Sequence, residues 1–123
     1  MVAMTIRAIR GAITLDLDER DHLHERTREL VEAIMRENAL VPDDVISVIF
    51  TCTPDIVSDF PAAAARVMGF GAVPLMCAQE MAVPGALPLV VRVMMHADVD
   101  RPRDQIVHVY LRGAVALRRD LAQ

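Results

Sequence analysis

One arginine stands inside an apolar stretch of the chain, where a permanent charge is unexpected. The stretch "LPLVVRVMMHAD" runs from Leu87 to Asp98, and Arg92 lies near its centre. An arginine side chain does not lose its proton in proteins. Removing its charge from water costs roughly several kcal/mol unless an anion and good hydrogen bonds compensate. Arg92 therefore indicates an internal pair with a carboxylate, a strand edge open to water, or a binding site for an anion.

Other side chains could help to bind a small anionic molecule. Glu80 lies in "CAQEMAVPG", between an apolar segment and a loop, and Arg10 lies in an alternating segment near the N-terminus. Tyr110 is the only tyrosine, and Leu117 and Arg118 are adjacent near the C-terminus. Each also has a purely structural interpretation: a solvated carboxylate, an amphipathic tyrosine that fills the core, or a solvated terminal segment.

The remaining reactive residue types form no recognisable catalytic or metal-binding pattern. His22 and His24 are two positions apart on an expected helix, so their side chains point in different directions. Cys52 and Cys77 form no CxxC motif, which disfavours a disulfide or a zinc site. Neither serine lies in a nucleophile-elbow pattern, and no glycine-rich phosphate loop is present. The sequence thus predicts no metal and no cofactor, and it favours carboxylate binding or a reaction without covalent catalysis.

The composition excludes several classes of function. The chain has 123 residues, of which 54% are hydrophobic and 24% charged, as is typical of one globular domain spanning residues 1–123. A net charge of -4 and only one tyrosine and three phenylalanines disfavour nucleic-acid binding. No apolar run is long enough to span a membrane, and the N-terminal segment lacks the pattern of a signal peptide, so we expect a cytoplasmic protein. All thirteen basic residues are arginine, so Schiff-base chemistry has no lysine to use.

Hydrophobic periodicity predicts five strands and two helices that position these residues. Strands are expected over residues 5–15, 45–53, 73–79, 89–97 and 106–111. A helix is expected from an acidic cap within residues 16–18 to about residue 38, a short helix over 60–66, and a short irregular tail over 112–123. The order indicates an α+β fold with a single mixed β-sheet and two helices on one face.

Two helices can cover only one face of this sheet. The first helix is expected to bury the stripe of Leu23, Thr27, Leu30, Val31, Ile34 and Met35. The third, fourth and fifth strands are apolar on both sides, so the other face of the sheet needs a partner. Self-association into a closed ring is the simplest way to cover it.

Eight short motifs make the chain resemble the monofunctional, homotrimeric chorismate mutases of the α/β pseudo-barrel type. They are "IRGA" at 9–12, "TPD" at 53–55, "FPA" at 60–62, "QEM" at 79–81, "RVMM" at 92–95, "DQI" at 104–106, "HVYL" at 108–111, and "LR" with a following "DL" near the end. The resemblance covers nearly the whole chain. It implies three subunits forming a pseudo-α/β barrel with active sites between them. It also implies the Claisen rearrangement of chorismate to prephenate, a step toward phenylalanine and tyrosine, without a cofactor.

The resemblance also implies roles for individual residues. Arg92 would stabilise the negative charge that develops on the ether oxygen as its bond breaks. Arg10 and Tyr110 would bind substrate carboxylates, and Glu80 would accept a hydrogen bond from the ring hydroxyl. The remaining substrate contacts would be Phe60, Arg66, Leu75, Met76, Cys77, Leu117 and Arg118. The segment 60–66 and the C-terminal tail would come from a subunit neighbouring the one that supplies the strand residues.

Two other functions fit the same residues. One is a trimer that binds a small carboxylate without catalysis, as a sensor or scaffold. The other is an imine or enamine hydrolase on the same trimeric architecture, which would release ammonia from an imino acid. Of the mutase and the non-catalytic binder, only the mutase requires a guanidinium aimed at a breaking ether bond.

Overall fold

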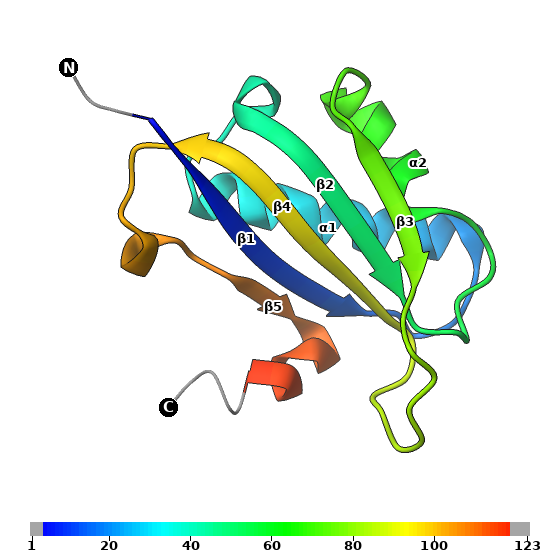
Figure 1. The fold of residues 1–123 in the computed structure, drawn as a ribbon. Helices are drawn as coiled ribbons and strands as arrows, with labels where there is room; N and C mark the ends of the chain where they lie inside the picture. Colours follow the sequence, from blue (N-terminus) through cyan, green and yellow to red (C-terminus); the bar gives the residue numbers. More distant parts are fainter. Residues whose placement is uncertain (1–3, 119–123) are drawn as a thin grey trace.

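The computed structural model describes residues 4–118, and its elements follow the order that the periodicity predicts (Figure 1). The strands are β1 (Thr5–Thr14), β2 (Val45–Cys52), β3 (Leu75–Gln79), β4 (Val90–Val99) and β5 (Val109–Leu111), and the α-helices are α1 (Arg20–Glu37) and α2 (Pro61–Ala65). A π-helical turn (Arg66–Phe70) continues α2, and short 3₁₀ helices occupy Pro42–Asp44, Arg103–Gln105 and Arg112–Arg118, the last named η4. No helix within residues 4–118 is both long and apolar enough to cross a membrane.

The five strands form one mixed sheet in the order β3-β2-β4-β1-β5. The central strand β4 runs antiparallel to its neighbours β1 and β2, whereas β3 is parallel to β2 and β5 is parallel to β1. Helix α1 crosses behind the sheet, and α2 lies behind it near β3, on the same side (Figure 1). The predicted single mixed sheet with two helices on one face is therefore confirmed.

The core lies between α1 and the face of the sheet that it covers. Alternate residues of β4, Val91, Val93 and Met95, are buried against this side, and so is most of the predicted helical stripe. Gly11 of β1 faces α1 closely, because a Cβ atom there would lie only 2.7 Å from Ile34 Cδ1. A side chain at this position would force Ile34 to move, so glycine allows the helix to pack closely on the sheet.

The start of α1 differs from the prediction. The cap is Glu19, whose carboxylate accepts hydrogen bonds from the backbone N–H groups of Asp21 and His22, and not a residue within 16–18. Asp18 instead accepts from the backbone of the loop before α2 at Val57 and Ser58. The Ser58 side chain, followed by these backbone bonds, lowers the pKa of Asp18. Asp18 therefore makes a tertiary contact with a distant loop and does not cap the helix.

The helical stripe also contains a residue that the pattern missed. Arg26 is buried, and its guanidinium donates to the Thr14 carbonyl and to Asp16 Oδ2, both at 2.7 Å. Met35, predicted as buried, is only half-buried. The guanidinium of Arg26 caps the end of β1, which explains how a charge is accommodated at this position.

Three more segments differ from the prediction. The strand predicted over 106–111 is limited to β5, because both backbone polar groups of Val107 bond to the buried side chain of Asn38 instead of extending the strand. Strand β3 begins at Leu75, two residues later than expected. Residues 112–118 of the predicted irregular tail form η4, and residues 119–123 lie outside the described residues.

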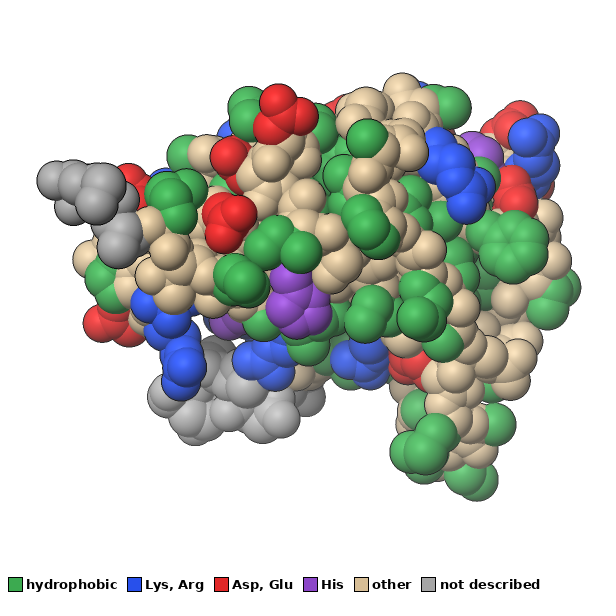
Figure 2. Space-filling model, turned by 45° about the horizontal axis from the view of Figure 1, so that its top comes forward, with side chains coloured by type: hydrophobic (Ala, Val, Ile, Leu, Met, Phe, Trp, Pro, Cys, Tyr) green, Lys and Arg blue, Asp and Glu red, His purple; other side chains and the backbone are tan. Residues whose placement is uncertain are grey.

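The second face of the sheet, called here the open face, is only partly covered. It carries Ile6, Ala8, Arg10, Ile49, Thr51, Met76, Ala78, Arg92, Met94, His96 and Tyr110, all exposed or half-exposed. Helix η4 covers a small part of it, where Ala114 packs on Ala12 and Val90. Figure 2 shows basic side chains lying among hydrophobic ones on this side of the molecule. The prediction that the helices leave one sheet face unburied is therefore confirmed for the subunit.

Candidate active site

Three predicted site residues lie close together on the open face. Ala12 of β1 is paired with Arg92 on one side and with Tyr110 on the other. Arg10 lies two residues before Ala12 and so projects from the same face of β1. A cavity of about 200 Å³ is lined by Arg10, Gly11, Ile49, Thr51, Arg92, Val93, Met94 and Tyr110. The strand order thus brings two guanidinium groups and a phenol from β4, β1 and β5 to one hollow.

Arg92 is held in a fixed orientation by Glu80. Its Nε donates to both carboxylate oxygens of Glu80, at 3.0 and 3.1 Å, and the Thr51 hydroxyl donates to Glu80 Oε2 at 2.8 Å. The Glu80 backbone N–H also donates to the Cys52 carbonyl, which continues the alignment of β3 with β2. Among residues 4–118, the terminal Nη groups of Arg92 have no hydrogen-bond partner. They are therefore oriented donors that a bound anion can use.

The single chain leaves Arg92 partly open to water, which is one of the interpretations considered above. The side chain of Arg92 is 43% exposed and that of Glu80 is 18% exposed. The neighbours Val91 and Val93 point into the core, so the alternation of β4 places Arg92 on the open face. The internal pair with a carboxylate is also present, whereas the anion site stays a prediction.

The residues near the C-terminus join this group within the same chain. The guanidinium carbon of Arg118 lies 5.3 Å from the centre of the Tyr110 ring, and Arg118 Nη1 donates to the His108 carbonyl at 3.2 Å. Leu117 and Tyr110 both pack against the small cluster formed by Ala12, Val90 and Ala114. The expectation that Leu117 and Arg118 come from a neighbouring subunit is therefore wrong in this structure, because η4 packs on its own sheet.

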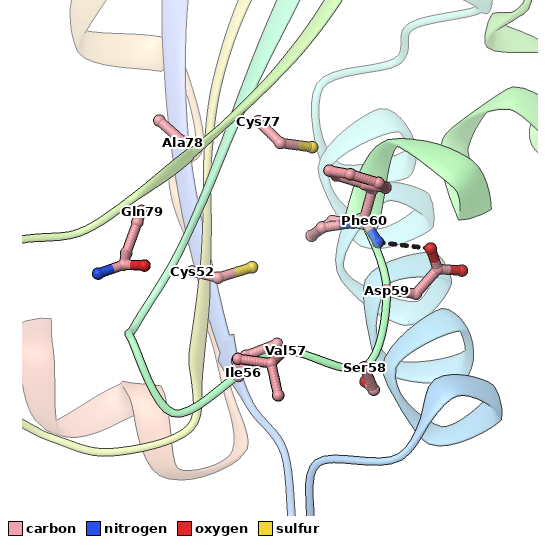
Figure 3. A pocket seen from close by; sticks show the side chains of 10 residues that line it. Cys52, Ile56, Val57, Ser58, Asp59, Phe60, Cys77, Ala78 and Gln79 are labelled. Atoms are coloured by element: carbon pink, nitrogen blue, oxygen red, sulfur yellow. Dashed lines mark hydrogen bonds between the residues drawn. The ribbon is translucent and has the colours of Figure 1, made fainter.

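Most of the other predicted site residues lie elsewhere in the chain. Phe60 and Cys77 line a second cavity of about 390 Å³, together with Cys52, Ile56, Val57, Ser58, Asp59, Pro61, Ala78 and Gln79 (Figure 3). The Cys52 and Cys77 side chains point toward Phe60, on the helix-covered side of the sheet (Figure 3). Leu75 also packs against the main core, whereas Met76 is exposed on the open face. Arg66 is exposed at the end of α2. Met76 thus shares the open face with Arg92 and is paired with Ile49 of its cavity, whereas Phe60, Arg66, Leu75 and Cys77 lie elsewhere in the chain.

The second cavity contains a cysteine with little reactivity and a well-anchored aspartate. Burial, which disfavours the thiolate, raises the pKa of Cys52 to about 12. Asp59 accepts hydrogen bonds from His24 Nε2 and from the Phe60 backbone, both at 2.7 Å, and from Arg20 Nε at 3.3 Å. These contacts hold the pKa of Asp59 below its usual value. The aspartate thus ties Phe60, which is 67% exposed, to α1.

Sequence reasoning missed three residues that hold predicted site residues in place: Thr51, Asp59 and His108. Thr51 lies on the same face of β2 as Ile49. Its hydroxyl, a polar group on an otherwise apolar strand, was the sequence signal that could have identified it. Asp59 directly precedes the "FPA" motif. An acidic residue at this position is a candidate to accept hydrogen bonds from the backbone at the start of the short helix. His108 opens the "HVYL" motif, and no neighbouring residue marks its imidazole as a hydrogen-bond acceptor. Its contact with β1 depends on strand pairing that no local pattern reveals.

Comparison with known proteins shows the family to which this chain is similar. Residues 6–121 match the family model described as chorismate mutase type I. The chain is 47% identical over 117 residues to "Chorismate mutase AroH" of Thermus thermophilus, which covers 94% of this chain and 96% of the relative. It is 45% identical over 120 residues to "Chorismate mutase AroH" of Bacillus subtilis (strain 168), which covers 97% and 94% of the two chains. The solved structure "Chorismate mutase from Clostridium thermocellum Cth-682" superimposes with a TM-score of 0.88 at 44% identity, covering 89% of this chain and 98% of that one.

Proposed function

The chain belongs to the chorismate mutase type I family and is a chorismate mutase, and from this premise we propose how its own residues bind chorismate and promote its conversion to prephenate. The reaction breaks a C–O ether bond as a C–C bond forms within one molecule. It transfers no proton to the protein and needs no nucleophile, metal or cofactor. The protein must therefore hold the dianionic substrate in a compact conformation and stabilise the charge that develops on the ether oxygen.

Arg92 is the residue that we propose to stabilise the ether oxygen. The observation that carries this assignment is the Nε contact with Glu80, at 3.0 and 3.1 Å, because it fixes the guanidinium plane and leaves both Nη groups without a hydrogen-bond partner among residues 4–118. A donor that is already oriented before the reaction needs no reorganisation as charge develops. Glu80 has a second role in the proposal, which is to accept a hydrogen bond from the ring hydroxyl.

Arg10 and Tyr110 are proposed to bind a substrate carboxylate, with Arg118 and Leu117 beside them. The guanidinium of Arg10 lines the same cavity as Arg92, and Arg118 lies over the Tyr110 ring. Two arginines in addition to Arg92 match the two carboxylates of the substrate in charge. Arginine suits this role because its planar donors match the geometry of a carboxylate.

The site is proposed to be completed by a second subunit in a homotrimer. Phe60 and Arg66 lie apart from the Arg92 cluster in one chain, and Phe60 is 67% exposed. The open face carries half-exposed or exposed apolar residues, which a closed ring of three sheets would cover as a pseudo-α/β barrel. In the trimer, Phe60 and Arg66 of one subunit would contact substrate held by Arg92 of the next, and Leu75, Met76 and Cys77 would contact it from the same subunit as Arg92.

Two broader proposals accompany this function. Residues 1–123 are proposed to form one chorismate mutase domain, which the family match over residues 6–121 supports. The protein is proposed to act in the cytoplasm, where thiols stay reduced, and the free state of both cysteines supports this.

The decisive experiment is to add purified protein to chorismate and follow the loss of its ultraviolet absorbance, with prephenate identified as the product. Light scattering after gel filtration should give three times the 13.6 kDa mass of the chain. A protein that binds chorismate without changing its absorbance would be the non-catalytic binder. Release of ammonia from an imino acid, with no effect on chorismate, would instead identify the hydrolase.

A further inference from the structure

His108 lies directly before β5 and connects three residues of the proposed site. The Arg10 backbone N–H donates to His108 Nδ1 at 3.0 Å. The pairing of β1 with β5 covers only Gly11 to Ile13, so the imidazole supplies an acceptor just beyond its end. The His108 carbonyl accepts from Arg118, which in turn lies over Tyr110. This histidine therefore joins the strand that carries Arg10 to the segment that carries Tyr110 and Arg118.

The contact with Arg10 requires one protonation state of the imidazole. A backbone N–H can only donate, so Nδ1 must be unprotonated and the neutral ring carries its hydrogen on Nε2. The charged groups that act on His108 from neighbouring elements are Arg10 on β1 and Arg118 on η4. Burial, followed by the charges of Arg10 and Arg118, lowers the pKa of His108. The neutral ring is therefore the main form near pH 7. Protonation at lower pH would place an Nδ1–H donor opposite the backbone N–H donor of Arg10.

We propose that His108 is a positioning residue, whose neutral imidazole holds Arg10 in place to bind a carboxylate of chorismate. This inference rests on the proposed function, in which Arg10 binds that carboxylate. Protonation of His108 breaks the bond to β1 and adds a third positive charge beside Arg10 and Arg118, so β1 and β5 separate locally. Because a carboxylate contact acts alike on the bound substrate and on the transition state, its loss raises KM more than it lowers kcat.

Three variants separate this role from general structural support. His108→Ala should raise KM about three- to tenfold at every pH, because this factor corresponds to the net free energy of one hydrogen bond. In His108→Asn, the amide oxygen can accept the Arg10 N–H without titrating, so KM should stay near the wild-type value and no longer depend on pH. The matched control is His22→Asn, because His22 Nε2 also accepts a backbone N–H, from Asp16 at 3.0 Å, but near α1. This control should keep the wild-type pH profile.

The experiment is to measure kcat and KM for chorismate from pH 5 to 8 and to titrate the wild-type imidazoles by NMR. The wild-type KM should rise about three- to tenfold as His108 is protonated below its ordinary pKa of 6.5, while kcat changes less than about twofold. A wild-type KM that stays constant or falls through the His108 titration overturns the inference, as does a rise that persists in His108→Asn. If no variant consumes chorismate, the proposed function fails. The NMR titration still tests the contact, because an Arg10 amide resonance that does not follow His108 overturns it.

Discussion

Replacement of Arg92 by alanine tests the assignment on which the mechanism depends. The Nε contact with Glu80 and the Thr51 hydroxyl fix the guanidinium before substrate arrives. Loss of one such preorganised donor costs about 2.7–4 kcal/mol of transition-state stabilisation, or about 10²–10³-fold in kcat. We therefore expect Arg92→Ala to lower kcat at least about a hundredfold, measured by the loss of chorismate absorbance.

The effect on folding should be much smaller than the effect on catalysis. The Arg92 side chain is 43% exposed, and an ion pair this accessible contributes about 1 kcal/mol or less to stability. Circular dichroism and gel filtration should show an Arg92→Ala protein with wild-type secondary structure and assembly state. Arg36→Ala is the matched control, because Arg36 is an exposed arginine on α1, and its activity should equal that of the wild type.

A lysine at the same position separates charge from geometry. Arg92→Lys keeps the positive charge but cannot hold Glu80 through Nε while offering two further donors. Its kcat should also fall at least about tenfold, because a flexible ammonium is not preorganised toward the ether oxygen. Near-normal turnover in the alanine variant would refute the role of Arg92, and near-normal turnover in the lysine variant would refute the argument from geometry.

Further expectations concern packing, pH and thiol reactivity. Gly11→Ala should lower the free energy of unfolding by about 1–3 kcal/mol, because the new Cβ would lie 2.7 Å from Ile34 Cδ1; thermal unfolding measures this, and Gly71→Ala, which has open space, should change little. The kcat should be constant between about pH 6 and 8, because no proton moves; a bell-shaped profile would contradict the mechanism. Stability should fall as pH drops below 6.5, because folding lowers the pKa of His108 and the unfolded chain then binds more protons; His108→Asn should lose this component in denaturant titrations at several pH values. Cys52, with a pKa of about 12, should react with a thiol reagent at pH 8 much more slowly than a free thiol, and rapid labelling would show that the thiol is not desolvated.

The sequence alone predicted the order of elements and the positions of the main candidates. Period-two alternation is a local property, so it revealed β1 and β4 with nearly correct bounds and indicated that Val91 and Arg92 face opposite sides. Counting helices against strands also predicted an incompletely covered sheet. These inferences succeeded because each depends only on residues that are close together in the chain.

Tertiary structure decided the features that depend on contacts between distant segments. Glu80 reaches Arg92 across β2, with Thr51 between them, and no spacing in the sequence predicts that pair. Likewise, Asn38 bonds to Val107 and so delays the start of β5, and His108 accepts a bond from β1. Alternation assigns a residue to a face but does not say what covers that face. The exposure of Arg92 and the direction of its donors therefore became known only when the strands were placed side by side.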